Sequence, residues 1–438
     1  MDQTEALIIE TIDRHREEII EFARDIYSHA ELGYKEFQTS GKFVKKMEQL
    51  GLRTEKGFAI TGVKAYLNED KKENASLALL GELDALRIPE HAFANPETNA
   101  AHCCGHHAQM AGVFGAALAL TVPEIAEKLD GQVVFFATPA EEYGEIEFKN
   151  QLREQGKIRY GGGKCELLRI GAFDDIDLCL THHIRPGNEI LVGSGTGNGF
   201  VSKVIRVLGK ASHAAGAPEK GVNALSAASL GLQALGLNRE TFRDEDCVRV
   251  HPIITKGGNL VNVIPDEVVV ETLVRGKTIE AFTDAAKKTD RSFKAGAIAM
   301  GAKVEISTLP GYLPTLAEEA LPELKHAAEI SASDIPVIEA SGHAGGSTDV
   351  GDVQHLMPVY TFNTGGVKGG LHQIDFEVTD EEEAYIVTAK MFALAAYGLL
   401  KEKAQRSREL VDQYEPVFKN SAEYVEFMEQ FDSKEIFE

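Results

Sequence analysis

Cysteine and histidine side chains crowd into one short stretch of the chain. The segment AAHCCGHHAQM (101–111) brings together His102, Cys103, Cys104, His106 and His107. Thiolates and neutral imidazoles bind metal ions, and a thiolate beside an imidazole can also act as a nucleophile. The cluster therefore has three chemical interpretations: a metal site, a cysteine nucleophile or a redox pair.

Spacing separates these interpretations in part. A redox Cys-x-x-Cys motif is absent, because Cys103 and Cys104 are adjacent. A structural zinc site needs four closed ligands, typically with paired cysteines, and the sequence has no second pair of this kind. A nucleophilic Cys104 with His106 as its base remains possible.

Polar side chains also follow three apolar runs that predict buried strands. These runs are SLALLGELDAL (76–86), GQVVFFATPAEE (131–142) and IDLCLTHHI (176–184). Their contiguous apolar residues are typical of parallel strands covered on both faces. In open α/β sheets, ligands bind outside the carboxyl ends of the strands. We therefore expect the polar residues that end these runs to share one edge of a sheet.

A hydrolytic two-metal centre needs a bridging anion, neutral imidazoles, a carboxylate ligand and a free carboxylate to handle the proton of a water molecule. Glu141 can be the free carboxylate, since adjacent glutamates on a loop point in different directions. The sequence thus favours a metal site over a cysteine nucleophile, which stays open as an alternative. The candidate ligands are Cys104, His106, Glu142, His183 and His372.

Composition narrows the class of protein. The 438 residues carry a net charge of −23, which disfavours nucleic acid as a partner. We expect no membrane partner, because no apolar stretch approaches the roughly 20 residues that span a bilayer. The start lacks the pattern of a signal peptide, and the five scattered cysteines do not suggest a disulfide framework. These features predict a cytoplasmic protein.

The order of the elements predicts two domains. Strands alternating with helices, including the small-residue helix 108–120, indicate an α/β catalytic domain over 1–196. Residues 197–308 follow the order β-α-β-β-α-β, which predicts an inserted ferredoxin-like α+β domain. The α/β pattern resumes over 309–438, with a core strand within 357–365 and a C-terminal helical extension. We expect a mostly parallel sheet flanked by helices, with the smaller domain inserted into it.

These motifs together resemble the M20 family of metallopeptidases and amidohydrolases. The resemblance is strongest to the branch of N-acyl-amino-acid and aminobenzoyl-glutamate hydrolases. It covers most of the chain, in the order of the family's motifs. The segments that carry it are SHAELGYKEFQTS, GELDAL, HCCGHHAQ, ATPAEE, HHIRP, GKASHAAGAPEKGVNAL, GGNLVNVIPDE, GSTDVGDV and LHQIDFEVTDEE.

The resemblance implies a role for each candidate residue. Glu141 would be the general base, and Asp84 would support the site. The implied cofactors are two divalent ions, Zn²⁺ or Mn²⁺. The implied metal ligands are Cys104, His106, Glu142, His183 and His372.

The inserted domain resembles the family's dimerisation and lid domain. His213 in KASHAAG would reach the partner subunit's site and stabilise the developing oxyanion. Asn262 and Arg275 would bind the substrate, with Arg275 holding a carboxylate by a bidentate pair. The resemblance therefore implies a homodimer that forms through this domain.

The sequence departs from the family at three positions. His107 stands where Asp or Asn is usual, Gln109 replaces a frequent histidine, and Arg87 replaces a proline. His107 could add a ligand or compete as one. We expect His107, as well as His102 and His182, to pack beside the site rather than bind metal.

The resulting hypothesis is a metal-dependent hydrolase of small N-acyl amino acids or dipeptide-like substrates, of the aminobenzoyl-glutamate or hippurate type. A water molecule held by the metal ions would lose its proton to Glu141 and attack the amide carbonyl. Two alternatives remain: an amidase that depends on Cys104, and a catalytically degenerate family member that binds a small molecule.

Overall fold

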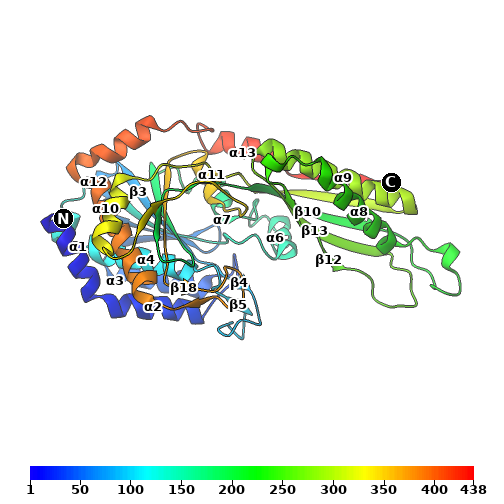
Figure 1. Cartoon of the computed structure of the whole chain (residues 1–438), viewed down its shortest axis with the longest axis horizontal. Helices are drawn as coiled ribbons and strands as arrows, with labels where there is room; N and C mark the ends of the chain where they lie inside the picture. Colours follow the sequence, from blue (N-terminus) through cyan, green and yellow to red (C-terminus); the bar gives the residue numbers. More distant parts are fainter. The chain divides into compact units, whose positions relative to one another are not determined.

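Eight strands form the large sheet of the protein (Figure 1). The computed structural model describes all residues from 1 to 438. The sheet belongs to a first unit made of residues 1–195, 316–342 and 352–421. In spatial order the strands are β1 (Arg53–Phe58), β2 (Gly62–Leu67), β6 (Gln132–Thr138), β3 (Ser76–Glu82), β7 (Leu178–Ile184), β17 (Val359–Thr364), β8 (Ile190–Val192) and β15 (Val337–Glu339).

The centre of this sheet is parallel, as the sequence predicts. Strand β3 pairs in parallel with both β6 and β7, and β17 pairs in parallel with β7. Strands β1 and β2 add an antiparallel edge. Every residue of β3 and β6 is buried, which explains why their apolar residues are contiguous.

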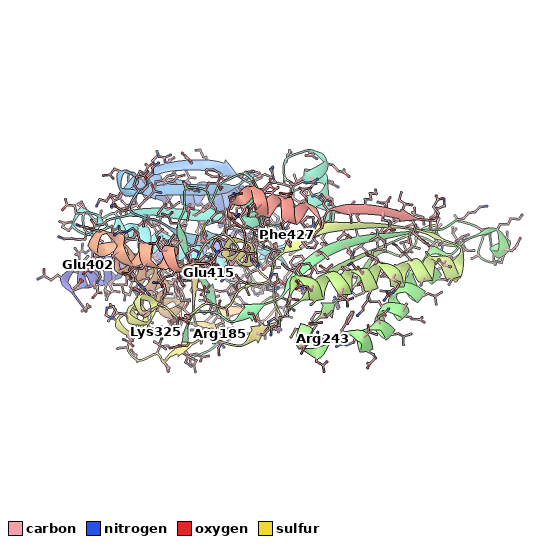
Figure 2. All side chains as sticks on the ribbon, turned by 90° about the horizontal axis from the view of Figure 1, so that it is seen from above. Arg185, Arg243, Lys325, Glu402, Glu415 and Phe427 are labelled. Atoms are coloured by element: carbon pink, nitrogen blue, oxygen red, sulfur yellow. The ribbon has the colours of Figure 1, made fainter.

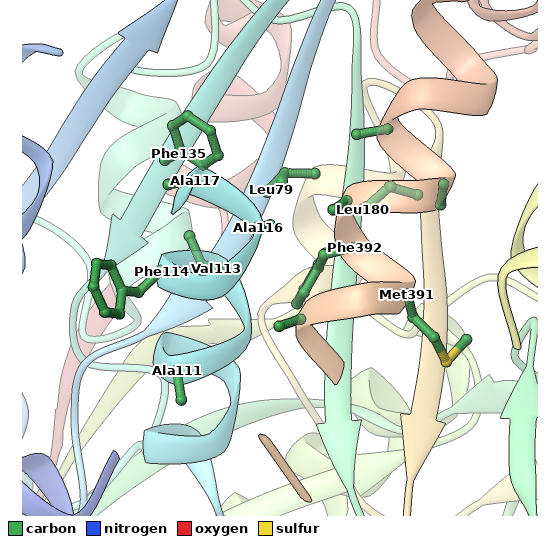
Figure 3. Close-up of a cluster of buried hydrophobic side chains, with 14 of the residues drawn as sticks. Leu79, Ala111, Val113, Phe114, Ala116, Ala117, Phe135, Leu180, Met391 and Phe392 are labelled. Carbon is green, nitrogen blue, oxygen red and sulfur yellow. The ribbon is translucent and has the colours of Figure 1, made fainter. Parts of the chain in front are cut away.

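Two helices cover the middle of the sheet. Helix α4 (His106–Leu120) is buried along its whole length, and α12 (Thr388–Gln413) packs beside it. Figure 3 shows Phe114 of α4 and Phe392 of α12 among side chains from the strands, including Leu79 and Phe135. A helix that is apolar on all sides must be buried, so the composition of 108–120 predicts this position.

Further helices complete the first unit. The N-terminal helical stripe that the sequence predicts is split in two, because His15 leaves the helical conformation with φ of −98° and ψ of 12°. The other helices add shorter segments around the sheet. They are α1 (Gln3–Arg14), α2 (Arg16–Ser28), α3 (Phe37–Gln49), α5 (Pro123–Ala126), α6 (Ile146–Glu154), α7 (Gly163–Arg169), α10 (Pro322–Ser331) and α11 (Val350–Gln354), of which α11 crosses the boundary of the unit.

One helical stretch is longer and more apolar than expected from the sequence. Residues Glu382–Gln413 are long and apolar enough, by length and composition, to cross a membrane. However, 89% of the apolar window is buried inside the protein. This burial is typical of the core helix of a globular protein.

The second unit contains an antiparallel sheet and two long helices. It is made of residues 196–315, 343–351 and 422–438. Its elements run β10 (Gly199–Leu208), α8 (Ala224–Asn238), β11 (Arg249–Val250), β12 (Ile253–Lys256), β13 (Glu267–Gly276), α9 (Ile279–Met300) and β14 (Lys303–Tyr312). Strand β10 lies between β13 and β14, and β12 pairs with β13. This arrangement is that of a split βαβ unit.

The C-terminal segment corrects the predicted domain boundaries. The pattern of elements predicts that all of 309–438 belongs to the catalytic domain, with a helical end. Instead, β14 continues to Tyr312, and the chain returns to the first unit only at residue 316. The segment after α12 forms α13 (Ser421–Glu429) and β20 (Ser433–Phe437), and β20 pairs with β14 (Figure 2). The few apolar residues of this strand lie among charged ones, so it shows no clear strand pattern.

An enclosed carboxyl in the first unit predicts a pH-dependent stability. Burial raises the pKa of Glu318 to about 8, although Thr361 N–H donates a hydrogen bond to it. The protonated form is favoured in the folded state, so stability is lost as the pH rises from the unfolded pKa near 4.5 through 8. Glu318→Gln should therefore unfold at a higher urea concentration than wild type at pH 9, by at most about 5 kcal/mol, and at a similar concentration at pH 5.

The exposed neighbour Glu319 supplies the matched control for this experiment. Glu319→Gln should leave the urea midpoint close to wild type at both pH values, because an exposed carboxyl stays hydrated in both states. A gain for Glu318→Gln that is equal at pH 5 and pH 9 would contradict the raised pKa.

Candidate metal centre

Cys104 lies at the centre of the predicted ligands. Its Sγ is 3.3 Å from His183 Nε2 and 3.3 Å from His372 Nε2. Two sets of candidate ligand atoms each lie within 4.8 Å of one another, and both contain Cys104. One set adds His106 and His183, and the other adds Glu142 and His372. A thiolate common to two ligand sets is placed to bridge two ions.

The start of α4 positions His106. Gly105 caps this helix with φ of +84°, and a Cβ atom at Gly105 would lie 2.0 Å from Ile184 Cγ2. Only glycine fits both this backbone conformation and this contact. His106 Nδ1 lies 2.8 Å from the carbonyl oxygen of Asp84. Because a carbonyl only accepts, Nδ1 carries the hydrogen and Nε2 is left for a metal ion.

The other two histidines are held by neighbouring backbone groups. His183 lies near the end of β7, and its Nδ1 is 2.7 Å from the carbonyl oxygen of Ile184, which again leaves Nε2 as the ligand atom. His372 has a φ of +62°, and its backbone N–H donates to the Cys103 carbonyl. This contact ties the loop of His372 to the cysteine segment.

Two buried carboxylates hold the loop that carries the glutamate pair. Ala140 has a φ of +49°, and its backbone N–H donates to Glu36 Oε1 over 2.8 Å. The next two backbone N–H groups, of Glu141 and Glu142, donate to Asp84 Oδ1 and Oδ2 over 3.1 and 2.9 Å. Asp84 therefore supports the site by orienting this loop and His106.

The donor set fits divalent ions. Tetrahedral zinc with sulfur and nitrogen ligands would separate these atoms by about 3.6 Å, close to the 3.3 Å between Cys104 Sγ and each imidazole nitrogen. Glu142 Oε1 is buried and forms no hydrogen bond by geometry, yet His372 Nε2 is only 3.1 Å away. Two such atoms lie side by side without hydrogen bonding when both act as ligands of one cation.

Electrostatics at the centre also favour positive charge. Burial and then Glu142 raise the pKa of Cys104 well above its usual value. Burial alone would lower the pKa of His106, but Glu82 and Cys104 raise it well above its usual value. Both groups therefore retain protons when no other cation neutralises the surrounding carboxylates. A bound metal ion would replace these protons.

The histidines that were expected to pack beside the site do so. His107 Nε2 lies 3.2 Å from Tyr385 Oη, and its ring contacts Tyr27. His182 Nε2 lies 2.8 Å from Thr364 Oγ1. None of these histidines, nor His102, belongs to a group with metal-binding geometry.

A third group at the centre was not predicted from the sequence. Glu82, His106 and Glu141 also have ligand atoms within 4.8 Å of one another. Lys164 and Gln109 donate hydrogen bonds to Glu82. Glu82 lies two residues before Asp84, so its place at the strand end was a usable signal. Lys164 carried none, because a lysine near the start of a helix is usually exposed.

The remaining predicted residues lie in the second unit. His213 is exposed, and its Nδ1 accepts hydrogen bonds from the N–H groups of Ala215 and Gly216. Asn262 lies on the neighbouring segment, where its carbonyl accepts from Ala214 N–H. Arg275 is on β13, and its Nη1 donates to Ser347 Oγ over 2.7 Å. The structure thus brings His213 and Asn262 together on adjacent segments.

Comparison with known families gives the class of the protein. The family described as "Peptidase family M20/M25/M40" matches residues 78–397, which include all five candidate metal ligands. The chain belongs to this family. Membership means that the protein is a hydrolytic enzyme of the M20 peptidase and amidohydrolase group.

Several relatives of this M20 hydrolase align over much of their length. The chain is 27% identical over 408 residues to the Xaa-Arg dipeptidase of Mus musculus, covering 90% of this chain and 85% of the relative. It is 25% identical to the N-acetyl-L-cysteine deacetylase of Bacillus subtilis (strain 168), covering 89% and 90%. It is 27% identical to a p-aminobenzoyl-glutamate hydrolase of Escherichia coli (strain K12), covering 70% and 60%.

A solved structure shows the same fold. The Bacillus subtilis YXEP protein, described as a dinuclear metal-binding peptidase from the M20 family, superposes with a TM-score of 0.61 at 24% identity. The match covers 89% of this chain and 99% of that protein. Together with the ligand groups around Cys104, family membership supports the use of divalent metal by this M20 hydrolase.

Proposed function

We propose that this M20 hydrolase cleaves the amide bond of small N-acyl amino acids or dipeptide-like substrates, of the aminobenzoyl-glutamate or hippurate type. Two divalent ions, Zn²⁺ or Mn²⁺, would be its cofactors. The observation that carries the proposal is the shared position of Cys104 in two ligand sets, with Glu141 beside them. The names of the relatives, a dipeptidase, a deacetylase and an aminobenzoyl-glutamate hydrolase, support the same class of substrate.

The residues of the chain divide the work of amide hydrolysis. Cys104, His106 and His183 would hold one ion, and Cys104, Glu142 and His372 the other. When bound, the ions supply charge that polarises the amide carbonyl and lowers the pKa of a water molecule. Glu141 takes the proton from the attacking water. It then gives the proton to the amine nitrogen as the C–N bond breaks.

Residues of the second unit would bind the substrate and stabilise the oxyanion. Because His213 Nδ1 accepts two backbone hydrogen bonds, its proton is on Nε2, which makes this exposed nitrogen a hydrogen-bond donor. A donor of this kind suits the oxygen that becomes negative when water attacks. Asn262 and the Arg275 guanidinium would bind the substrate, and Arg275 would pair with its carboxylate.

The second unit would also carry the dimer interface, with His213 acting on the site of the partner subunit. Its edge strand β12 leaves Ile253 and Ile254 exposed, and the following loop exposes Leu260 and Val261. Apolar side chains on an edge strand favour pairing with another chain. A second copy of this chain is the partner that we propose, in the cytoplasm, where the five free cysteines would stay reduced.

An amidase that depends on Cys104 is the first competing function. An activated cysteine needs a lowered pKa, but burial raises that of Cys104. Chelation separates the two functions. Dialysis against EDTA should reduce turnover at least about a hundredfold, and Zn²⁺ or Mn²⁺ should restore it, because the ions supply both substrate polarisation and water activation. Turnover that survives complete removal of metal would support the cysteine enzyme instead.

A degenerate family member that only binds a small molecule is the second competing function. The same protein, loaded with Mn²⁺, should hydrolyse at least one member of a panel of N-acetyl amino acids, hippurate, aminobenzoyl-glutamate and Xaa-Arg dipeptides. The release of free amine measures this activity directly. Binding of a panel member without any release of amine would favour the binding protein.

A further inference from the structure

A buried ion pair lies directly beside the candidate metal ligands. Glu82 is the last residue of β3, and its Oε1 accepts a hydrogen bond from Lys164 Nζ over 2.6 Å. Glu82 is 3% exposed and Lys164 is fully buried. A buried ammonium is costly unless a charge partner compensates it, so the two groups depend on each other.

The second oxygen of Glu82 faces the centre. Glu82 Oε2 lies 2.8 Å from Gln109 Nε2 and 3.1 Å from His106 Nε2. Gln109 also accepts a hydrogen bond from the backbone N–H of Glu82. Since His106 Nδ1 contacts the Asp84 carbonyl, Nε2 is the atom that would bind metal. A carboxylate oxygen thus lies next to a ligand atom, within reach of the same ion.

The backbone holds Lys164 in this position. Gly163 N–H donates to the Ala140 carbonyl, which ties the start of α7 to the loop of the glutamate pair. A Cβ atom at Gly163 would lie 1.6 Å from the Pro139 carbonyl oxygen, so the two segments are in close contact. Lys164 therefore cannot leave Glu82 without moving the loop that carries Glu141.

Charge explains what this pair does for the ions. Cys104, Glu142 and the free base Glu141 already surround two ligand sets with negative charge. An unpaired Glu82 would be a further anion beside His106 and a natural oxygen ligand. With Lys164 on Oε1, the pair is neutral, and Glu82 serves as the acceptor that orients Gln109.

We propose that Lys164 is a positioning residue of the metal centre, whose ammonium keeps Glu82 bound to Gln109 and prevents this carboxylate from becoming a sixth metal ligand. The proposal rests on the proposed function in one respect, because it requires that the five ligands bind divalent metal. It assigns no catalytic step to Lys164. Instead, it predicts how the resting protein binds metal.

The test uses the full chain loaded with Co²⁺, whose visible absorption reports the number and type of ligands. Lys164→Met should change the absorption bands, as Glu82 joins the coordination sphere, and raise Co²⁺ affinity. Glu82→Gln should leave an unpaired ammonium and lower the affinity about tenfold or more. The double variant Glu82→Gln/Lys164→Met should regain the wild-type spectrum and an affinity within about threefold of wild type, because neither charge remains.

Lys64→Met is the matched control, since Lys64 is also a buried lysine of the first unit and pairs with Asp175 away from the centre. It should leave the Co²⁺ spectrum unchanged even if it lowers the thermal stability. A Lys164→Met protein that is destabilised but keeps the wild-type spectrum and affinity would overturn the proposal. If Lys164→Met does not fold, the double variant decides: a spectrum or affinity unlike wild type overturns the proposal.

Failure of the proposed function would look different. Spectra that respond to the variants as expected, in a protein that hydrolyses no substrate of the panel, would reject the amidohydrolase function and keep the role of Lys164. A wild-type protein that binds no Co²⁺ would reject both.

Discussion

Glu141→Gln should keep the metal content of the wild type while kcat falls at least about a hundredfold, the lower end of what general base catalysis contributes. Glutamine has nearly the same size as glutamate but cannot accept the proton of the attacking water. The backbone N–H of Glu141 still donates to Asp84, so the loop should keep its conformation. Metal analysis and steady-state kinetics on the same preparation measure both quantities.

The neighbouring residue provides the matched comparison. Glu142 belongs to a ligand group with Cys104 and His372, so Glu142→Gln should lose metal as well as activity. If Glu141→Gln loses metal and Glu142→Gln retains it, the two glutamates have the opposite roles. The pair of variants therefore tests the assignment of base and ligand within one loop.

A mixture of two inactive variants should recover activity if His213 acts on the partner subunit. Glu141→Gln and His213→Ala should each be nearly inactive as homodimers. When equal amounts exchange subunits freely, about half of the dimers are heterodimers with closed twofold symmetry. In each heterodimer, one site carries both substitutions and the other carries neither. Roughly a quarter of all sites should then be active by this count.

The control for this experiment is the amount of heterodimer. Differently tagged chains, co-expressed and purified through both tags, isolate the mixed dimer, about half of whose sites should be active by the same count. A purified heterodimer without recovered activity would mean that His213 acts within its own subunit or takes no part. The exposed position of His213 and its Nε2 proton favour recovery.

The fold was largely predictable because its central strands are strongly patterned. The contiguous apolar runs that end at Glu82, Thr138 and Ile184 are typical of buried strands, and each is followed by polar residues at one edge of the sheet. The C-terminal strand was not predictable, because SKEIF has too few apolar residues to stand out. Its pairing depends on the exposed edge of β14, a partner far away in the sequence.

The same difference applies to the candidate site. Cys104, His106 and Glu142 are types of residue that bind metal, so their chemistry was visible before their positions were known. Lys164 is different, because its importance comes from its burial against Glu82 and not from its residue type. Long-range pairs of this kind have no spacing rule. They can be found only once the structure brings the two segments together.

The most direct test of the central claim is the metal content of the protein with and without the Cys104 thiol. Wild-type protein should contain about two equivalents of divalent metal per chain, as expected for a two-metal hydrolase. Cys104→Ala should hold less than about one, because this thiolate belongs to both ligand groups. Cys103→Ala, which removes the adjacent buried thiol, should keep the wild-type content. A Cys104→Ala protein that still binds the full wild-type amount of metal would contradict a centre built on Cys104.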